Sequence, residues 1–156
     1  MDSIHKETSS RSSEMPKRWT RASVLLILVV ALFTGCKGDK VCNTPMGDAS
    51  CQLDLMQYPN LIGGNGYEYI VGGYQGLAVI RISTEDYAAY ERTCPHDRGR
   101  LEFSKDYGNT VLECPDCHSR FNAFADGVPL EGSQTSCSLY QYSTHYASGT
   151  LYISNW

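Results

Sequence analysis

The sequence predicts an all-β protein, a small antiparallel sandwich or barrel, and two observations carry this prediction. From Tyr67 onward, short runs rich in β-branched and aromatic residues alternate with turn residues. Outside an apolar run at 22–34, no window shows the apolar periodicity of an amphipathic helix. The predicted strands are 67–71, 77–83, 87–92, 110–113, 139–145 and 150–154.

Turn residues separate the predicted strands in chain order. A Gly-Gly pair at 72–73 and a Gln-Gly pair at 75–76 divide the first strand from the second, and Ala-Ser-Gly at 147–149 divides the last two. The strand at 110–113 leads directly into Cys114. The chain also has 11 tyrosines. They fit this architecture, because tyrosines in strands pack as half-buried core residues and cross-strand partners.

The N-terminal region resembles the signal peptide of a bacterial lipoprotein. Lys17, Arg18 and Arg21 precede the apolar run at 22–34, and a Thr-Gly step then leads to Cys36. The run is shorter than the about 20 residues that a spanning helix needs. The resemblance implies cleavage before Cys36, acylation of its thiol, and a domain in the cell envelope that faces out of the cytoplasm. The alternative is an uncleaved N-terminal anchor.

These patterns divide the chain into three parts. We expect a signal peptide at 1–35, whose true start is Met15, then a lipid-anchored tether at 36–58, which is polar and has no period. The folded domain is expected at 59–156. Within it, residues 93–127 are expected to form a smaller hairpin unit.

The charge of the chain excludes one large class of partner. After cleavage before Cys36, eight Lys and Arg face fourteen Asp and Glu, so the mature part carries about six negative charges. Nucleic-acid binding requires a basic patch, so no nucleic-acid partner is expected. No Ser/His/Asp order and no glycine-rich phosphate loop stands out. We therefore expect no hydrolase, and no catalytic residue is assigned.

Two cysteine–histidine boxes are the strongest chemical signal in the chain. One residue separates Cys94 from His96, and two residues separate Cys114 from Cys117, which His118 follows directly. Thiolates and imidazoles at such spacing bind iron–sulfur clusters or zinc. The 17 residues between the boxes are enough for two strands and a turn. The alternative is that these cysteines only pack in the core or form disulfides.

The boxes resemble the two loops that bind the [2Fe–2S] cluster in Rieske domains. The family pattern is C-x-H followed by C-x-x-H, with Gly-Ser and an aromatic residue directly after. Downstream, an Asp-Gly turn at 126–127, then Leu139 and Tyr142, follow the order in which Rieske domains end. The likeness covers about 76–156 and, more faintly, 60–75. It implies a Rieske-type fold that carries a cluster for single-electron transfer.

The second box departs from the family pattern. In strict register Cys117 takes the place of the second family histidine, and His118 takes the place of the glycine. Ser119 then falls on the serine that hydrogen-bonds a bridging sulfide, and Phe121 on an aromatic position often held by tyrosine. The implied metal ligands are Cys94, His96, Cys114 and Cys117. His118 is the alternative fourth ligand, and it requires one inserted residue in the loop.

The two resemblances together predict an envelope-anchored iron–sulfur protein that passes single electrons to or from a redox partner protein. We expect a non-catalytic electron carrier or a component of an oxidoreductase, and the sequence does not identify the partner. A ferredoxin-like subunit of an oxygenase or reductase chain is a further possibility, against which the lipid anchor argues. Three cysteines and one histidine are also a standard zinc set. The alternative function is therefore a structural or binding lipoprotein that keeps the Rieske fold and holds zinc or no metal.

The cysteines that remain suggest one disulfide. Cys42 and Cys51 lie close together in the chain and could form a bridge in an oxidising compartment. Cys137 is then expected as a lone buried thiol. Rieske proteins of cytochrome bc complexes carry a disulfide between the two cluster loops. Gly99 stands where its first cysteine would be, so that disulfide is not expected here.

Overall fold

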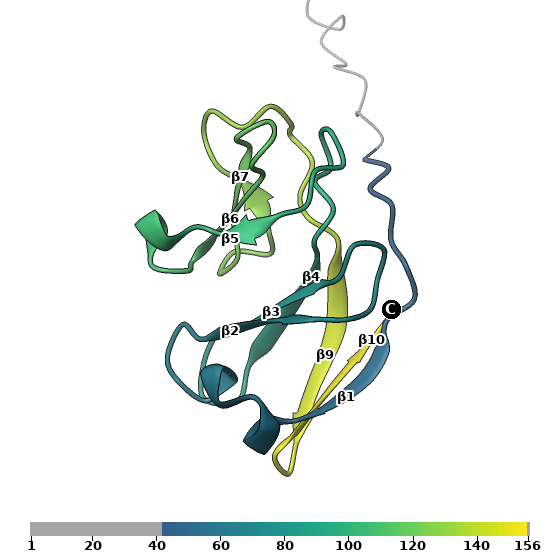
Figure 1. Cartoon of the computed structure of the whole chain (residues 1–156), viewed down its shortest axis with the longest axis vertical. Helices are drawn as coiled ribbons and strands as arrows, with labels where there is room; N and C mark the ends of the chain where they lie inside the picture. Colours follow the sequence, from purple (N-terminus) through teal and green to yellow (C-terminus); the bar gives the residue numbers. More distant parts are fainter. Residues whose placement is uncertain (1–41, 156) are drawn as a thin grey trace, which may run out of the picture. The chain divides into compact units, whose positions relative to one another are not determined.

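The computed structural model describes residues 42–155, which form two antiparallel β-sheets (Figure 1). The larger sheet has the strand order β1–β10–β9–β4–β3–β2, and the smaller sheet has the order β5–β6–β7–β8. The larger sheet consists of β1 (Ser50–Asp54), β2 (Tyr67–Ile70), β3 (Leu77–Arg81), β4 (Tyr87–Glu91), β9 (Gln141–Ala147) and β10 (Thr150–Ser154). The smaller sheet consists of β5 (Glu102–Phe103), β6 (Val111–Glu113), β7 (Arg120–Asn122) and β8 (Val128–Pro129).

The helices among residues 42–155 are short 3₁₀ turns, and this range contains no α-helix. The turns are η1 (Leu55–Gln57), η2 (Pro59–Leu61) and η3 (Lys105–Tyr107). All strand pairs are antiparallel. The predicted all-β antiparallel class is therefore confirmed.

The hairpin of β3 and β4 is buried on both of its faces and separates two hydrophobic cores. Alternate side chains of a strand point to opposite faces. Ala78 and Ile80 of β3 accordingly pack in one core with residues of the smaller sheet, and Leu77 and Val79 pack in the other core. Buried β4 residues divide in the same way. Strands buried on both faces have continuous rather than alternating apolar sequences, as in the segment 77–80.

The core between the two sheets is closed by contacts from β4 and from the turn after β7. The hydroxyl of Tyr90 on β4 donates to the carbonyl of Ala123 at 2.9 Å. Burial raises the pKa of Tyr90 to about 12, so this hydroxyl keeps its proton. At the predicted Asp-Gly turn, Gly127 has φ of +64°, and a Cβ there would lie 2.8 Å from Leu139 Cβ. This turn therefore requires a glycine.

Strand β1 lies within the range of the predicted tether. Its residues, Ser50–Asp54, pair along their whole length with β10, from Ser50 opposite Ser154 to Asp54 opposite Thr150. Within the range 36–58, residues 50–54 thus belong to the larger sheet. The predicted strands overlap β2, β3, β4, β6, β9 and β10. The unpredicted β5, β7 and β8 have only two or three residues, too few for a strand period.

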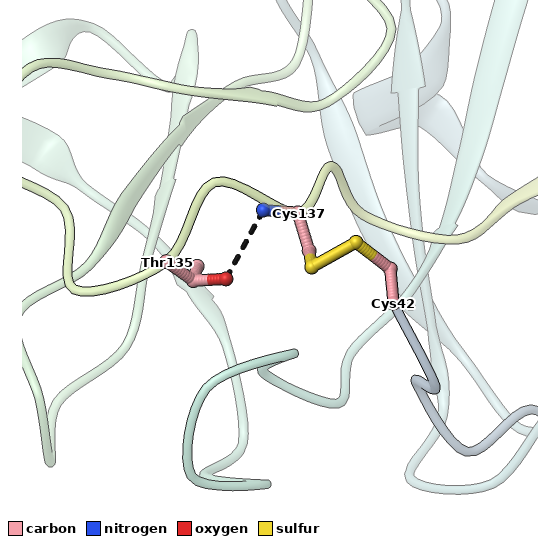
Figure 2. Close-up of a disulfide and its surroundings, with 3 residues drawn as sticks. All are labelled: Cys42, Thr135 and Cys137. Carbon is pink, nitrogen blue, oxygen red and sulfur yellow. Dashed lines mark hydrogen bonds between the residues drawn. A yellow bond between two sulfur atoms is a disulfide. The ribbon is translucent and has the colours of Figure 1, made fainter. Parts of the chain in front are cut away.

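The disulfide differs from the predicted one. Cys42 pairs with Cys137 across a sequence separation of 95 residues, with Cα atoms 5.6 Å apart (Figure 2). The backbone N–H of Cys137 also donates to the Thr135 hydroxyl at 3.1 Å. Cys51 is a free thiol. Both predictions for these residues, a bridge between Cys42 and Cys51 and a lone Cys137, are therefore wrong.

The predicted signal peptide, Met15 start and acylated Cys36 lie outside the described residues. Within residues 42–155, no helix has the length and apolar character needed to cross a membrane.

Candidate metal centre

The two cysteine–histidine boxes fold into loops with the same backbone structure. In the first loop, residues 94–99, the N–H of Cys94 donates to the Gly99 carbonyl at 2.8 Å, and the Cys94 carbonyl accepts from the residue four positions later at 2.9 Å. In the second loop, residues 114–119, the N–H of Cys114 donates to the Ser119 carbonyl at 2.9 Å. The Cys114 carbonyl accepts from the N–H of His118, also at 2.9 Å. The two loops therefore present their side chains in equivalent positions.

Short antiparallel pairings hold the ends of both loops. Thr93 pairs with Arg100 around the first loop, and Glu113 of β6 pairs with Arg120 of β7 around the second. Each box has proline in its second place, at 95 and 115. Proline fixes φ near −65° and favours the second position of a turn. The local sequence thus starts each turn at the same place after the strand.

The fifth position of each loop has left-handed backbone. Arg98 has φ of +67° in the first loop and His118 has φ of +57° in the second. Such a φ is uncommon for residues other than glycine. In the strict register His118 stands where the Rieske pattern has glycine, so its backbone conformation fits that register.

The loops bring three thiols and one carboxylate together. Donor atoms of Cys94, Asp97, Cys114 and Cys117 all lie within 4.8 Å of one another. The Sγ atoms of Cys94 and Cys117 are 3.7 Å apart. The Cys114 thiol lies 3.4 and 3.6 Å from the two carboxylate oxygens of Asp97. Cys94 and Cys114 are fully buried, whereas Asp97 is exposed.

The two candidate histidines lie outside this group of donors. His96 is exposed, and none of its ring nitrogens belongs to the convergent set among the described residues. The His118 side chain is 77% exposed, and its Nδ1 lies 3.7 Å from Oε1 of Glu113. The structure therefore places three of the four predicted ligands together, with His96 nearby in the sequence of the first loop.

Asp97 is a donor that the sequence prediction did not include. Asp97 and Cys117 both lie three positions after the first cysteine of their boxes, and the equivalent loops bring them to equivalent places. Burial alone would raise the pKa of Asp97. Hydrogen bonds from the Gly99 N–H and from the three thiols nevertheless lower it to about 2, so the carboxylate is ionised. The shared spacing of the boxes was the available signal.

Ser119 contacts a sulfur of the site, and Phe121 packs in the same core as Cys94 and Cys114. The Ser119 hydroxyl is fully buried, lies 3.2 Å from Cys117 Sγ and accepts from the backbone N–H of Gln134 at 2.9 Å. Phe121 is fully buried in the core between the two sheets. Its ring has no hydroxyl, so this position offers the site an apolar surface rather than a hydrogen bond.

Two further observations show that the residues fit a metal centre. A Cβ built on Gly99 would lie 2.7 Å from Cys114 Sγ and 2.5 Å from Oδ2 of Asp116, so only glycine leaves this sulfur its space. Burial raises the pKa of the Cys94 and Cys114 thiols. A soft metal ion would displace these protons and neutralise the thiolates, because thiolate is the form that binds metal.

Comparison with known proteins agrees with this geometry. A family model, the Rieske [2Fe-2S] domain, matches residues 56–142, which is more than half of the chain. The chain belongs to the Rieske family. The matched range includes both loops and all the residues that converge at the site, and no curated protein matches the chain.

Two solved structures are similar to this Rieske chain. One comes from the complex of reduced oxygenase and oxidized ferredoxin in carbazole 1,9a-dioxygenase, with 24% identity and a TM-score of 0.43. The matched region covers 60% of this chain and 83% of that one. The other is the ferredoxin of carbazole 1,9a-dioxygenase from Nocardioides aromaticivorans IC177, with 16% identity and a TM-score of 0.47. Here the matched region covers 72% of this chain and 99% of that one.

Proposed function

We propose that this protein carries single electrons through a [2Fe–2S] cluster held by Cys94, His96, Cys114 and Cys117. The observation that carries the proposal is the convergence of three cysteine sulfurs at the tips of two equivalent loops in a Rieske-family chain. A [2Fe–2S] cluster supplies one-electron chemistry when it is bound. His96 of the first loop is the fourth ligand of the proposed cluster, and this residue is exposed to solvent.

The residues of this chain favour a low reduction potential. Three thiolates give the oxidised centre one more negative charge than the two thiolates of a histidine-ligated Rieske centre, which makes addition of an electron harder. Histidine-ligated centres have potentials of about −150 to +300 mV, and all-cysteine plant-type centres lie near −400 mV. We expect a potential between these classes. The carboxylate of Asp97 beside the sulfurs and the missing hydroxyl at Phe121 act in the same direction.

The envelope location is also part of the proposal. The leader with Lys17, Arg18 and Arg21 before the apolar run at 22–34 supports secretion, and Cys36 supplies a thiol for acylation. The disulfide between Cys42 and Cys137 supports the same location, because disulfides persist mainly in oxidising compartments. A lipid on Cys36 would hold the domain at a membrane, where its redox partner would meet it.

Metal and sulfide analysis of the protein purified without oxygen tests the electron-transfer proposal. We expect about two irons and two acid-labile sulfides per chain, as a [2Fe–2S] cluster requires. We also expect an EPR signal that appears on reduction. Stoichiometric zinc without labile sulfide would contradict the proposal and support the structural or binding lipoprotein instead.

Labelling with a radioactive fatty acid tests the anchor separately. The wild-type chain should be labelled and shortened at its N-terminus, and Cys36→Ser should be neither. Cys51→Ser is the matched control, because Cys51 is also a thiol outside the metal centre and outside the disulfide. Labelling of Cys36→Ser at the wild-type level would contradict the lipoprotein assignment.

A further inference from the structure

A hollow of about 540 Å³ lies between the β2–β3 turn, residues 71–76, and the strand ends that flank the first metal loop. Its volume is in the range of small-molecule sites. The lining residues that matter chemically are Tyr69, Val71, Tyr74, Gln75, Arg92 and Arg100. No candidate metal ligand lines this hollow, which is therefore separate from the metal centre.

Arg92 is a buried cation whose guanidinium is only partly used by the protein. The residue is 5% exposed, its Nε donates to the Leu101 carbonyl at 2.9 Å, and its Cζ lies 3.6 Å from the centre of the Tyr69 ring. Among residues 42–155, its two amino groups have no hydrogen-bond acceptor. No buried polar side-chain atom of this range lacks a partner, so these amino groups reach the open space of the hollow.

Arg100 places a second guanidinium beside the first. A Cβ on Gly76 would lie 3.5 Å from an amino nitrogen of Arg100 and 3.7 Å from Cδ of Arg92, so both side chains border the same point. Within the described range, neither arginine forms an ion pair. Glu102 and Glu91 are nearby carboxylates that interact electrostatically with Arg92 without forming an ion pair with it. Two adjacent guanidinium groups without a carboxylate partner form a site for an anion.

Three backbone amides of the turn donate to groups of the protein and are not available to this anion. The N–H groups of Tyr74 and Gln75 both donate to the buried carboxylate of Glu91, at 2.6 and 2.9 Å. The N–H of Gly73 donates to the Asp48 carbonyl at 3.0 Å. These three successive amides therefore do not form a phosphate-binding nest. The charged donors of the hollow are planar guanidinium groups, whose paired N–H groups match a carboxylate.

Exposed apolar side chains lie beside these donors. Val71 is 95% exposed and Tyr74 is 59% exposed, and both line the hollow. A ligand with an apolar group next to its carboxylate would cover these side chains and remove apolar surface from water. The same ligand would place its charge on the two guanidinium groups.

We propose that this hollow binds a small-molecule carboxylate that carries an apolar group. The carboxylate lies between Arg92 and Arg100, and the apolar group lies against Tyr74 and Val71. This assignment does not depend on the identity of the metal or on the proposed electron transfer.

Isothermal titration calorimetry of the purified full chain, with benzoate as the probe, tests the proposal. We expect saturable one-to-one binding of benzoate, and weaker binding of acetate, because acetate lacks the apolar group. Arg100→Gln should weaken benzoate binding at least about tenfold, the loss of one charge-assisted hydrogen bond. Tyr74→Ala should weaken benzoate binding but leave acetate binding unchanged.

Arg98→Gln is the matched control, because Arg98 is an exposed arginine of the same loop region that does not line the hollow. It should leave benzoate affinity within about twofold, since the Arg98 side chain does not line the hollow and salt screens exposed charges. Circular dichroism confirms that each variant is folded. The proposal is overturned if benzoate does not bind, if Arg98→Gln and Arg100→Gln weaken binding equally, or if phosphate binds as tightly as benzoate with the same dependence on Arg100.

Discussion

The two metal loops have one backbone structure but present different donors. Each begins with a buried cysteine, closes with the same pair of hydrogen bonds and has left-handed backbone at its fifth position. Three positions after the first cysteine, the first loop has the carboxylate of Asp97 and the second has the thiol of Cys117. The difference shows that the loop backbone fixes where a donor lies, while the chemistry of the donor can vary at that place.

The loops also differ in what supports them. The first is tied to the β2–β3 turn, where the Gln75 side chain donates to the Arg98 carbonyl at 2.7 Å. The second is covered by residues 133–137, in which the N–H of Gln134 donates to the Ser119 hydroxyl. The disulfide at Cys137 anchors the end of that covering segment (Figure 2). A disulfide thus anchors the segment that is hydrogen-bonded to the second loop, whereas the contact between the first loop and the β2–β3 turn is a hydrogen bond alone.

The largest effect is expected where the loops are equivalent. Cys94→Ser and Cys114→Ser should each abolish the metal centre, because both sulfurs are buried and belong to the convergent set. The loss of metal affinity should exceed the about 10–100-fold loss that follows replacement of a residue hydrogen-bonded to a metal ligand. Iron and sulfide analysis of the purified variants measures it. A centre retained in one variant and lost in the other would break the equivalence of the loops.

The next effect distinguishes the two registers of the second box. Cys117→Ser should change or abolish the EPR signal of the reduced protein, because Cys117 Sγ lies 3.7 Å from Cys94 Sγ. His118→Ala is the matched variant of the neighbouring residue. It should leave the signal nearly intact, since this side chain is 77% exposed. The opposite pattern would place His118 on the metal and show that the gapped register is right.

The covalent support of the second loop gives a smaller effect, on stability. Cys137→Ser removes the disulfide that closes a separation of 95 residues. It should lower the free energy of unfolding by about 2–5 kcal/mol, as measured by urea unfolding under oxidising conditions. Cys51→Ser, which removes a free thiol, is the control and should cost less. Equal losses in both variants would show that the bridge does not stabilise the fold.

The smallest effect concerns the hydrogen-bonded support of the first loop. Gln75→Ala removes one exposed hydrogen bond to the Arg98 carbonyl. We expect a loss of about 0.5–1.5 kcal/mol in the free energy of unfolding. Hydrogen exchange should quicken at the Arg98 amide and remain unchanged at the His118 amide. Equal acceleration at both amides would contradict separate support of the two loops.

The sequence predicted the features that depend on local spacing. The boxes, the Asp-Gly turn and the longer strands follow from residue order, and β10 has the predicted bounds, Thr150–Ser154. The disulfide was not predictable in this way, because Cys42 finds Cys137 only after the sheets have formed. Strand β1 was missed for a similar reason. Its polar, irregular sequence forms a strand because it pairs with the edge of β10.

The convergence of Asp97 with the three thiols shows the same limit. Histidine is the familiar metal ligand, so C-x-H in the sequence points to His96. The place of Asp97 beside Cys114 Sγ becomes visible only when the two loops are compared in space. The equivalent backbone structure of the two loops is a property of the folded chain. In the sequence it is indicated only by the shared spacing of the boxes.

The central claim is a centre with three thiolates and one imidazole, and pulsed EPR on the reduced protein labelled with ¹⁵N-histidine tests it most directly. We predict coupling to a single histidine nitrogen, lost in His96→Ala and retained in both His118→Ala and Asp97→Asn. Absence of any histidine coupling, together with an EPR signal changed by Asp97→Asn, would contradict this account. The carboxylate of Asp97 would then be the fourth ligand, in the place equivalent to Cys117.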